Sequence, residues 1–364
     1  MNALVPALCA AGVDVEVVSS SAGLDDEGRA AAMRNLAPAR ATIVPIWGPE
    51  RIELSPRLVP LLARKIAECD LVHLHTVFTF PLAAAAAIAR RAHVPYIVRP
   101  AGTLDELCLR NRSYAMKRLA LATWVGHMLK GAAAIHATSG LEAHELARWT
   151  ERIHEVELGA ATFEVPPDDG RRGTRLFTIG RLHPIKGLEH LLAAVALSAP
   201  DVTLTIAGNG ERRYVDSLKA RARPLAGRVE FVGEVGDPQK QALFANADLC
   251  VFPSLHESFG IGIVEAMAAG RAVIVTDGVG LAPIIAEAGA GLVVAPADAA
   301  GLAAAIASML AAGPDRPRAA EAARALASSR YSWKAAALRT RALYDDVLRR
   351  ARSIGVTGAA SGGS

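Results

Sequence analysis

Short runs of β-branched and aliphatic residues alternate with alanine-rich helical runs along almost the whole chain. This alternation is typical of parallel sheets covered by helices on both faces, because each crossover between parallel strands needs a connection that is usually a helix. The strand-like runs are Val13–Val18, Leu71–Leu74, Tyr96–Val98, Ala134–Ala137, Leu176–Ile179, Val202–Ala207, Val229–Val232, Leu249–Phe252, Val273–Val275 and Gly291–Val294. The helical runs include Pro81–Ala92, Leu188–Ala194 and Gln239–Ala245. The pattern predicts an α/β fold of the doubly wound kind.

The 364 residues are enough for two such domains at roughly 150 residues each. Proline, glycine and aspartate cluster between Phe163 and Arg175, which predicts a boundary there. We expect an N-terminal domain over 1–162, a linker over 163–174 and a C-terminal domain over 175–330, with ligands bound in the cleft between the domains. A helix over 331–352 would pack back toward the first domain, and the tail 353–364 is expected to be disordered.

Composition and charge exclude several classes of protein. Hydrophobic residues make up 52% of the chain and charged residues 21%, which excludes global disorder. No apolar run approaches the ~18 to 20 residues that span a bilayer, and no signal peptide is visible, so the expected compartment is the cytoplasm. The four cysteines stand singly, which fits neither a zinc site nor a disulfide framework. A net charge of +4 is too small to indicate a nucleic-acid partner.

The first domain is expected to lack its first strand. A doubly wound domain normally opens with a strand, a glycine-rich turn and a helix. This chain opens in the helix-like run Asn2–Ala11, which leads into the strand-like run Val13–Val18. We therefore expect either a natural reading frame that begins upstream of Met1 or a sheet that runs without its central strand.

The first motif that carries chemistry is the octapeptide GRLHPIKG at residues 180–187, directly after a strand-like run. Gly180 lets the chain turn, and Arg181 and Lys186 can place a bidentate fork and a point charge on one anion such as a diphosphate. The helix start that follows adds backbone N–H donors. The alternative is a solvated basic turn.

The second motif is the run PSLHESFGIGIVEAMAAG at residues 253–270. Glu257 lies at the carboxyl end of a strand, and Glu265 lies about two turns into the next helix. A carboxylate suits a vicinal diol, so one of these groups can hold ribose hydroxyls and the other sugar hydroxyls. Phe259, Gly260 and Ile261 would present backbone N–H groups at the helix start. The alternative is that both glutamates are ordinary surface residues.

Together these motifs resemble those of the retaining nucleotide-sugar glycosyltransferases of family 4, which have the GT-B fold of two Rossmann-like domains. Glu257 and Glu265 match the Glu-x7-Glu signature, and residues 180–187 match the Gly-Arg-Leu-x-x-x-Lys-Gly clamp. In the first domain the resemblance is looser. There, residues 73–75, 99–105 and 134–139 are similar to members that build bacterial exopolysaccharide or lipopolysaccharide.

The resemblance implies a role for each residue of the two motifs. Arg181 and Lys186 would hold the donor diphosphate and stabilise the charge that grows on it, so that neither a metal nor another cofactor is required. Glu257 would contact hydroxyls of the transferred sugar, and Glu265 would hold the ribose diol. The other donor-binding positions implied are Gly180, Phe259, Gly260, Ile261, Gly233 and Val235.

Two histidines in the first domain are candidates for a functional role. His73 and His75 share one face of a strand by its period of two, and His75 lies at the carboxyl end. By the resemblance His75, with Gly102 and Thr103, belongs to the sugar or acceptor side. The alternatives are a structural histidine and a metal pair that lacks a third ligand.

Two loops depart from the family pattern. Many members carry a histidine after the next strand, where residues 98–102 read VRPAG. Residues 276–283 read TDGVGLAP, where the family places a Gly-Gly turn followed by an acid. Backbone donors at 278–280 can still face a phosphate or sugar, and the alternative is an ordinary turn.

The stretch from Arg90 to Lys130 is strongly basic, since it contains eight lysine and arginine residues and only two acidic residues. Over 107–130 the cations are interleaved with apolar residues, and a basic amphipathic helix of this kind can lie on an anionic membrane surface. This pattern predicts a peripheral position on the inner face of the cell membrane. The alternative is a surface helix packed on its own sheet.

The leading hypothesis is a retaining glycosyltransferase that moves a sugar from a nucleoside diphosphate to a glycan or polyprenyl-linked acceptor in cell-surface polysaccharide synthesis. The rival is a non-catalytic GT-B protein that binds nucleotide sugar or acts as a scaffold, motivated by the missing first strand. A third option is a sugar epimerase of the same fold, which the motifs fit less well.

Overall fold

The structure is a computed structural model that describes residues 3–47, 53–105, 109, 114–171, 173–225, 227–311 and 313–360. The chain divides into two compact units, each with its own core: residues 1–157 with 333–364, and residues 158–332. The division falls at 157/158, before the predicted boundary. Residues 163–174, predicted as a linker, belong to the second unit, because Phe163 and Val165 are buried in its core and Asp168 forms a bidentate ion pair with Arg316.

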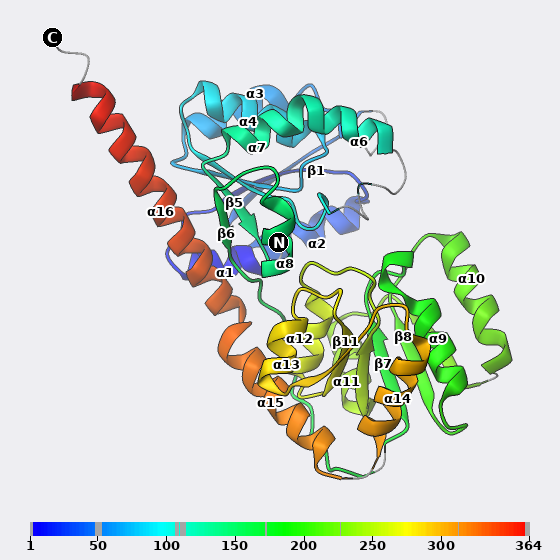
Figure 1. The fold of residues 1–364 in the computed structure, drawn as a ribbon. Helices are drawn as coiled ribbons and strands as arrows, with labels where there is room; N and C mark the ends of the chain where they lie inside the picture. The colour runs from blue at the N-terminus through cyan, green and yellow to red at the C-terminus, as the bar shows by residue number, and fades with distance from the viewer. Residues whose placement is uncertain are drawn as a thin grey trace. The chain divides into compact units, whose positions relative to one another are not determined.

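The second unit contains one six-stranded parallel sheet (Figure 1). Its strands are β7 (Arg175–Ile179), β8 (Thr203–Ala207), β9 (Val229–Gly233), β10 (Leu249–Phe252), β11 (Val273–Thr276) and β12 (Gly291–Val294). They lie in the order β12-β11-β10-β7-β8-β9. The chain therefore adds strands on one side of β7 and then on the other, so that β7 and β10 flank the point where the strand order reverses. This is a doubly wound Rossmann-like sheet.

Helices cover both faces of this sheet. The face that carries Leu204 and Val251 packs on α9 (Leu188–Leu197), α10 (Arg212–Ala222) and α14 (Ala299–Leu310). The opposite face packs on α11 (Asp237–Asn246), α12 (Ile261–Ala268), α13 (Ala282–Ala288) and α15 (Asp315–Arg330). Two short 3₁₀ turns are η2 (Pro184–Lys186) and η3 (Arg223–Leu225). In α9 the buried leucines and Val195 follow helical spacing, which is why this segment forms a helix against the sheet.

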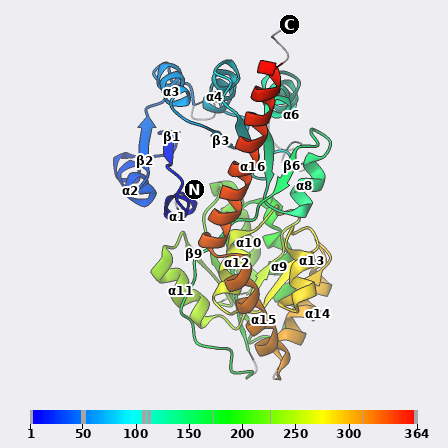
Figure 2. The ribbon, with the colours of Figure 1, turned by 90° about the vertical axis from the view of Figure 1, so that its left-hand side faces the viewer.

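The first unit contains two parallel sheets. One is the pair β1 (Glu16–Ser20) and β2 (Arg40–Val44), and the other has the order β3 (Val72–His75), β4 (Tyr96–Arg99), β5 (Ala134–Ala137) and β6 (Ile153–Glu155). Figure 2 shows β1 and β2 side by side, set apart from β3. No described strand joins β1 to β3, so the sheet is interrupted where the sequence predicts a missing first strand.

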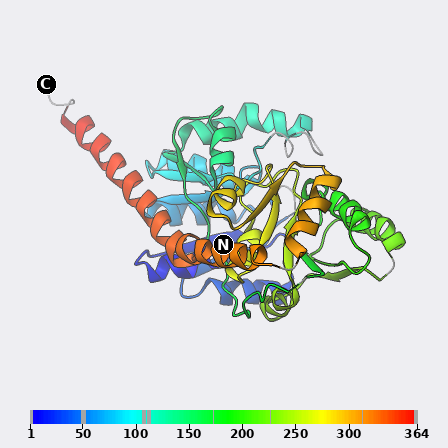
Figure 3. The same ribbon diagram turned by 60° about the horizontal axis from the view of Figure 1, so that its bottom comes forward.

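The helices of the first unit are α1 (Leu4–Ala10), α2 (Asp26–Leu36), α3 (Leu58–Ala67), α4 (Phe80–Arg91), α6 (Tyr114–Ala120), α7 (Gly126–Gly131), α8 (Gly140–Leu146) and α16 (Trp333–Ala360). A π-helical turn, η1 (Leu121–Val125), joins α6 to α7. Helix α16 packs on α1 and on the β3–β6 sheet of its unit. Figure 3 shows it as one continuous helix. The expected disordered tail is therefore not seen before Ala360, and residues 361–364 lie outside the described residues.

Candidate active site

Both sequence motifs follow the strands at the reversal point of the second sheet. The turn 180–187 follows β7, and the loop that carries Glu257 follows β10, which pairs with β7. In open parallel sheets, ligands bind outside the carboxyl ends of the strands at this point. The two motifs therefore meet where a doubly wound sheet places its ligand.

The two motifs are held together by their backbones as well as by their side chains. The Leu255 N–H donates to the Ile185 carbonyl at 2.8 Å, and the Lys186 Nζ forms an ion pair with Glu257 Oε2. Gly187 adopts a φ of 61°, and a Cβ at this position would clash with the Pro253 carbonyl. The glycine that ends the first motif thus lets it contact the second.

Lys186 is the less exposed of the two cations of this site, with 25% of its side chain exposed. Burial and, to a smaller extent, the nearby charge of Arg181 together lower its pKa to about 8. Arg181 itself is exposed. The site therefore combines an exposed guanidinium with a partly buried ammonium, two cations that can act on one anion.

Glu265 is buried on α12, with 6% of its surface exposed. Lys240 on α11 donates to its Oε1 at 2.9 Å and also lies 3.6 Å from Asp237. Burial raises the pKa of Glu265, and the Lys240 hydrogen bond opposes this rise. Lys240 was missed in the sequence, because it lies in a helix that carries no recognisable motif.

The start of α12 is open to a ligand. Gly260 has a φ of 89° and caps the helix, Ile261 is 42% exposed, and the Phe259 ring packs on Tyr331 in the core at 5.7 Å. Within the described part of the chain, the N–H groups of Phe259, Gly260 and Ile261 have no acceptor. These three donors can bind hydroxyl or phosphate oxygens.

A second glycine turn lines the same edge and was also missed. Gly208, after β8, sits so close to Gly180 that a Cβ would overlap the Gly180 carbonyl, and the Leu182 N–H donates to Asn209 at 2.8 Å. The signal available was the Gly-x-Gly pattern at 208–210, directly after a strand-like run. Gly233 ends β9, its carbonyl accepts from Gly208, and Val235 packs partly buried against the core.

Hydrogen bonds from the loop 276–281 hold the loop that carries Glu257 in place. Thr276 Oγ1 donates to the Ser254 carbonyl, the Gly280 N–H donates to the Glu257 carbonyl at 2.8 Å, and Glu257 N–H donates to Gly278 at 3.0 Å. The Gly280 donor is therefore used within the protein. The prediction that the backbone donors at 278–280 face a ligand is therefore wrong for the Gly280 N–H.

In the first unit, the structure brings the predicted histidines together with others. The His73 ring lies 4.3 Å from that of His75 and 5.3 Å from that of His136 on β5. His73 Nδ1 lies 2.8 Å from the Tyr344 hydroxyl, and His136 Nε2 lies 2.7 Å from the Val156 carbonyl. No group of histidine, cysteine, aspartate or glutamate side chains suited to a metal ion occurs among the described residues.

Gly102 and Thr103 follow β4. The Gly102 N–H donates to Glu142 at 2.7 Å, and Thr103 Oγ1 donates to the Pro100 carbonyl at 2.7 Å. Both polar groups therefore have partners inside the protein. Their assignment to the acceptor side stays a prediction.

Comparison with known proteins identifies the family. The family model described as Glycosyltransferase Family 4 matches residues 1–185, about half of the chain, and the model described as Glycosyl transferases group 1 matches residues 170–326. This chain belongs to glycosyltransferase family 4.

Curated relatives of this family 4 chain are similar over about half of their length. A phosphatidyl-myo-inositol mannosyltransferase of Mycolicibacterium smegmatis is 37% identical over 210 residues, which cover 56% of this chain and 53% of the relative. A D-inositol 3-phosphate glycosyltransferase of Jonesia denitrificans is 33% identical over 195 residues, 46% of each protein.

Solved structures resemble the family 4 chain over nearly its whole length. The structure of Anabaena HepE in complex with UDP-glucose superposes with a TM-score of 0.76 at 21% identity, covering 94% of this chain and 95% of that one. Sucrose-phosphate synthase from Thermosynechococcus elongatus gives a TM-score of 0.69 at 20% identity, covering 92% and 99%. These likenesses confirm the predicted α/β GT-B fold.

The predicted membrane-facing segment of the family 4 chain, residues 107–130, is described at Leu109, which is buried in the core of the first unit, and from Tyr114 on. Residues Arg110 and Arg112 lie outside the described residues. From α6 to η1 the exposed large apolar side chains are Tyr114, Met116, Leu119 and Trp124, with exposed fractions of 46%, 65%, 62% and 43%. Lys117 and Arg118 lie among them, and among the described residues no helix is long and apolar enough to span a bilayer.

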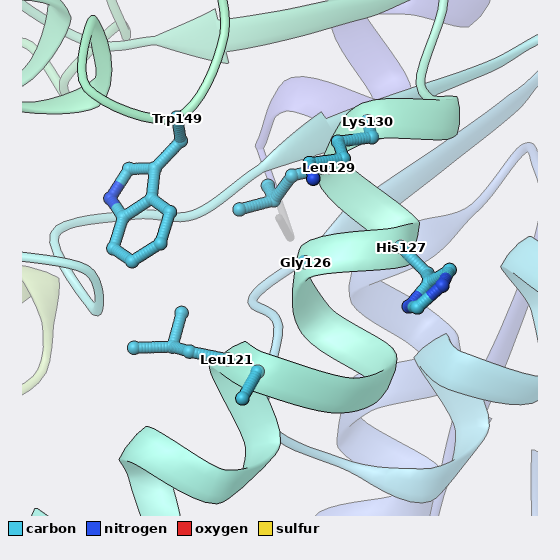
Figure 4. A pocket seen from close by; sticks show the side chains of 7 residues that line it. Leu121, Gly126, His127, Leu129, Lys130 and Trp149 are labelled. Atoms are coloured by element: carbon cyan, nitrogen blue, oxygen red, sulfur yellow. The ribbon is translucent and has the colours of Figure 1, made fainter.

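A cavity of about 200 Å³ lies beside this segment (Figure 4). Leu121 and Leu129 face the indole of Trp149, which lies between α8 and β6. Ala122 of η1 and Gly126, His127 and Lys130 of α7 complete the lining. The cavity is therefore mainly apolar and lies next to the exposed apolar side chains.

Proposed function

We propose that this chain is a retaining glycosyltransferase that transfers a sugar from a nucleoside diphosphate to a glycan or lipid-linked acceptor. The observation that carries the proposal is the junction of Lys186 and Glu257 at the reversal point of the second sheet. The name of the HepE complex, which contains UDP-glucose, supports a nucleoside-diphosphate donor.

In this reaction Arg181 and Lys186 hold the diphosphate and stabilise the charge that develops as the glycosidic bond breaks. Two cations fixed on one diphosphate do the work that a divalent metal does in other transferases, so the reaction requires no metal. When the donor binds, the ion pair between Glu257 and Lys186 breaks, and the Glu257 carboxylate accepts hydrogen bonds from the sugar hydroxyls. No carboxylate is needed as a nucleophile, because the leaving phosphate itself accepts the acceptor proton on the same face of the sugar.

The ribose and the base bind beside α12 and β9. Glu265 accepts hydrogen bonds from the ribose diol, and Lys240 holds its carboxylate in place. The free N–H groups at the start of α12 bind phosphate or sugar oxygens. Gly233 and Val235 border the base.

A screen of nucleoside-diphosphate sugars tests the proposal. Release of nucleoside diphosphate would be measured for UDP-, GDP- and ADP-sugars. Turnover with one donor family is expected. Binding of a donor by calorimetry without hydrolysis or transfer would instead favour a non-catalytic GT-B protein, the second candidate, which the interrupted sheet of the first unit supports.

We further propose that the reaction serves cell-surface polysaccharide synthesis at the inner face of the membrane. The relatives are named for phosphatidyl-myo-inositol and for inositol phosphate, which supports an acceptor that carries a lipid or a phosphate. The exposed apolar side chains and the cations of α6 support docking of this face on anionic lipid.

Co-sedimentation with liposomes tests this docking. Reversal of Arg110, Arg112, Lys117 and Arg118 to glutamate should abolish binding to anionic vesicles, because each cation near such a surface is worth about 1 kcal/mol. The matched control reverses four cations on α10 of the second unit, Arg212, Arg213, Lys219 and Arg221. Equal binding by both variants would contradict the docking.

A further inference from the structure

Arg99 is a largely but not fully buried cation at the carboxyl end of β4. It pairs in register with His75 of β3, and its Nη1 lies 3.4 Å from His75 Nδ1. Its Nε is buried without a hydrogen-bond partner, and the guanidinium forms no ion pair within the part of the chain that the structure describes. A buried charge normally has a partner, because burial removes it from water.

The neighbours of Arg99 do not supply that partner. Burial lowers the pKa of His73 and of His75 well below the ordinary value and lowers that of His136 to about 3, so these rings are neutral at physiological pH. Arg99 stays protonated, because its intrinsic pKa is far above neutrality. The cluster is therefore one cation among neutral rings.

Glu142 is the acid whose charge acts on Arg99, but its carboxylate is already occupied. Its Oε1 accepts from the Gly102 N–H at 2.7 Å. Its Oε2 accepts from the Thr138 N–H at 2.7 Å and from the Thr138 hydroxyl at 2.6 Å. Glu142 fixes the loop after β4 and leaves the Arg99 Nε without a contact.

The backbone around the cluster is strained. Thr76, which follows His75, has a φ of 74°, and its N–H donates to the Arg99 carbonyl at 2.8 Å. Ala101, two residues after Arg99, has a φ of 55°. Such conformations are costly for residues other than glycine and gather at ligand sites. Both lie at the carboxyl ends of neighbouring parallel strands, the edge at which ligands bind.

We propose that Arg99 and His75 form an anion-binding subsite in the first unit, which takes a phosphate or carboxylate carried by the acceptor. The guanidinium offers a bidentate fork and the neutral imidazole offers one further polar atom. Both side chains keep partial exposure, so an anion can reach them. The assignment of the anion to the acceptor rests on the proposed function, whereas the subsite itself rests on the geometry alone.

Imidazole NMR signals test the subsite in the whole protein. His75 would be assigned by loss of its signal in His75→Asn. Inorganic phosphate and acetate would then be titrated at constant ionic strength against chloride. A saturable shift of the His75 signal is expected, and the anion that produces it at the lower concentration identifies the group recognised.

Variants separate the subsite from the fold and from the donor site. Arg99→Met should lose the saturable shift, Arg99→Lys should retain part of it, and Arg91→Met, an exposed arginine of α4, should leave it unchanged. His183 in the second unit reports separately on nucleoside-diphosphate binding, so a failed donor site is distinguished from a failed subsite. With an acceptor in hand, Arg99→Met should raise its KM about 10- to 100-fold.

If phosphate, acetate and chloride all changed the His75 signal of the wild-type protein by the same small amount, without saturation, the proposal would be overturned. This outcome needs no variant, so it stands even if Arg99→Met does not fold. An unchanged saturable shift in a folded Arg99→Met protein would overturn it equally.

Discussion

If Lys186 binds the donor diphosphate as proposed, its pKa makes donor binding depend on pH. Its pKa of about 8 means that the ammonium begins to lose its proton just above neutral pH. Only the protonated form attracts a diphosphate, so the Kd for a nucleoside diphosphate should rise with pH above about 8, by up to tenfold per pH unit. Calorimetric titrations between about pH 7 and pH 10 measure this.

Lys186→Arg and Lys186→Met provide the controls. The arginine stays charged, so its Kd should stay constant over the same range, and the methionine variant should bind weakly at every pH. An identical pH dependence in wild type and Lys186→Met would show that another group titrates.

At the residue level, the sequence places Lys186 and Glu257 after two strands of the second domain, and the structure brings the two side chains together. Glu257 and Lys186 could be placed together because both follow strands of one parallel sheet, whose carboxyl ends share an edge. The partner of Glu265 could not be found, because Lys240 reaches it from another helix through tertiary packing alone. The same holds for His136 and Tyr344, which join His73 from distant parts of the chain.

At the level of elements, the strands made of β-branched and aliphatic residues were the predictable ones. All six strands of the second sheet coincide with apolar runs, whereas β2 and β6 were missed. Strand β2 is only partly buried and begins with Arg40, and β6 has three residues, two of them His154 and Glu155. Strand β1 begins at Glu16, later than the predicted run, because Val13 and Val15 pack with α1 and α16 instead.

Helix α16 completes the core of the first unit. Leu343 is 5% exposed and packs with Ile97, Val156 and Val347. Leu343→Ala should therefore lower the free energy of unfolding of this unit by about 2–4 kcal/mol. Leu338→Ala is the control, because Leu338 lies on the same helix and is 50% exposed. All four tryptophans lie in the first unit, so urea unfolding followed by tryptophan fluorescence reports on it alone.

Equal destabilisation by Leu343→Ala and Leu338→Ala would contradict this packing. Unfolding of the second unit can be followed by far-ultraviolet circular dichroism once the fluorescence change is complete. If Leu343→Ala lowered the stability of the second unit alone, this would contradict the packing as well.

On the scale of the whole molecule, the two units carry different parts of the chemistry. The second unit has an uninterrupted sheet and both motifs of the proposed donor site. The first unit has an interrupted sheet and Arg99, whose guanidinium forms no ion pair with any residue that the structure describes. The sequence predicted two doubly wound units because the alternation of runs repeats on both sides of residue 160. It misplaced the boundary, because the proline and glycine cluster marks an extended segment that packs on the second unit.

The central claim is that Arg181 and Lys186 drive the departure of a nucleoside diphosphate. The most direct test measures nucleoside-diphosphate release with a matched donor and acceptor for wild type, Arg181→Ala, Lys186→Ala and the exposed control Arg212→Ala. We predict a loss of turnover of about 100-fold or more at saturating donor in the first two variants, because charge stabilisation of the leaving group is lost, and no change in the third. Full turnover in Arg181→Ala and Lys186→Ala would contradict the account.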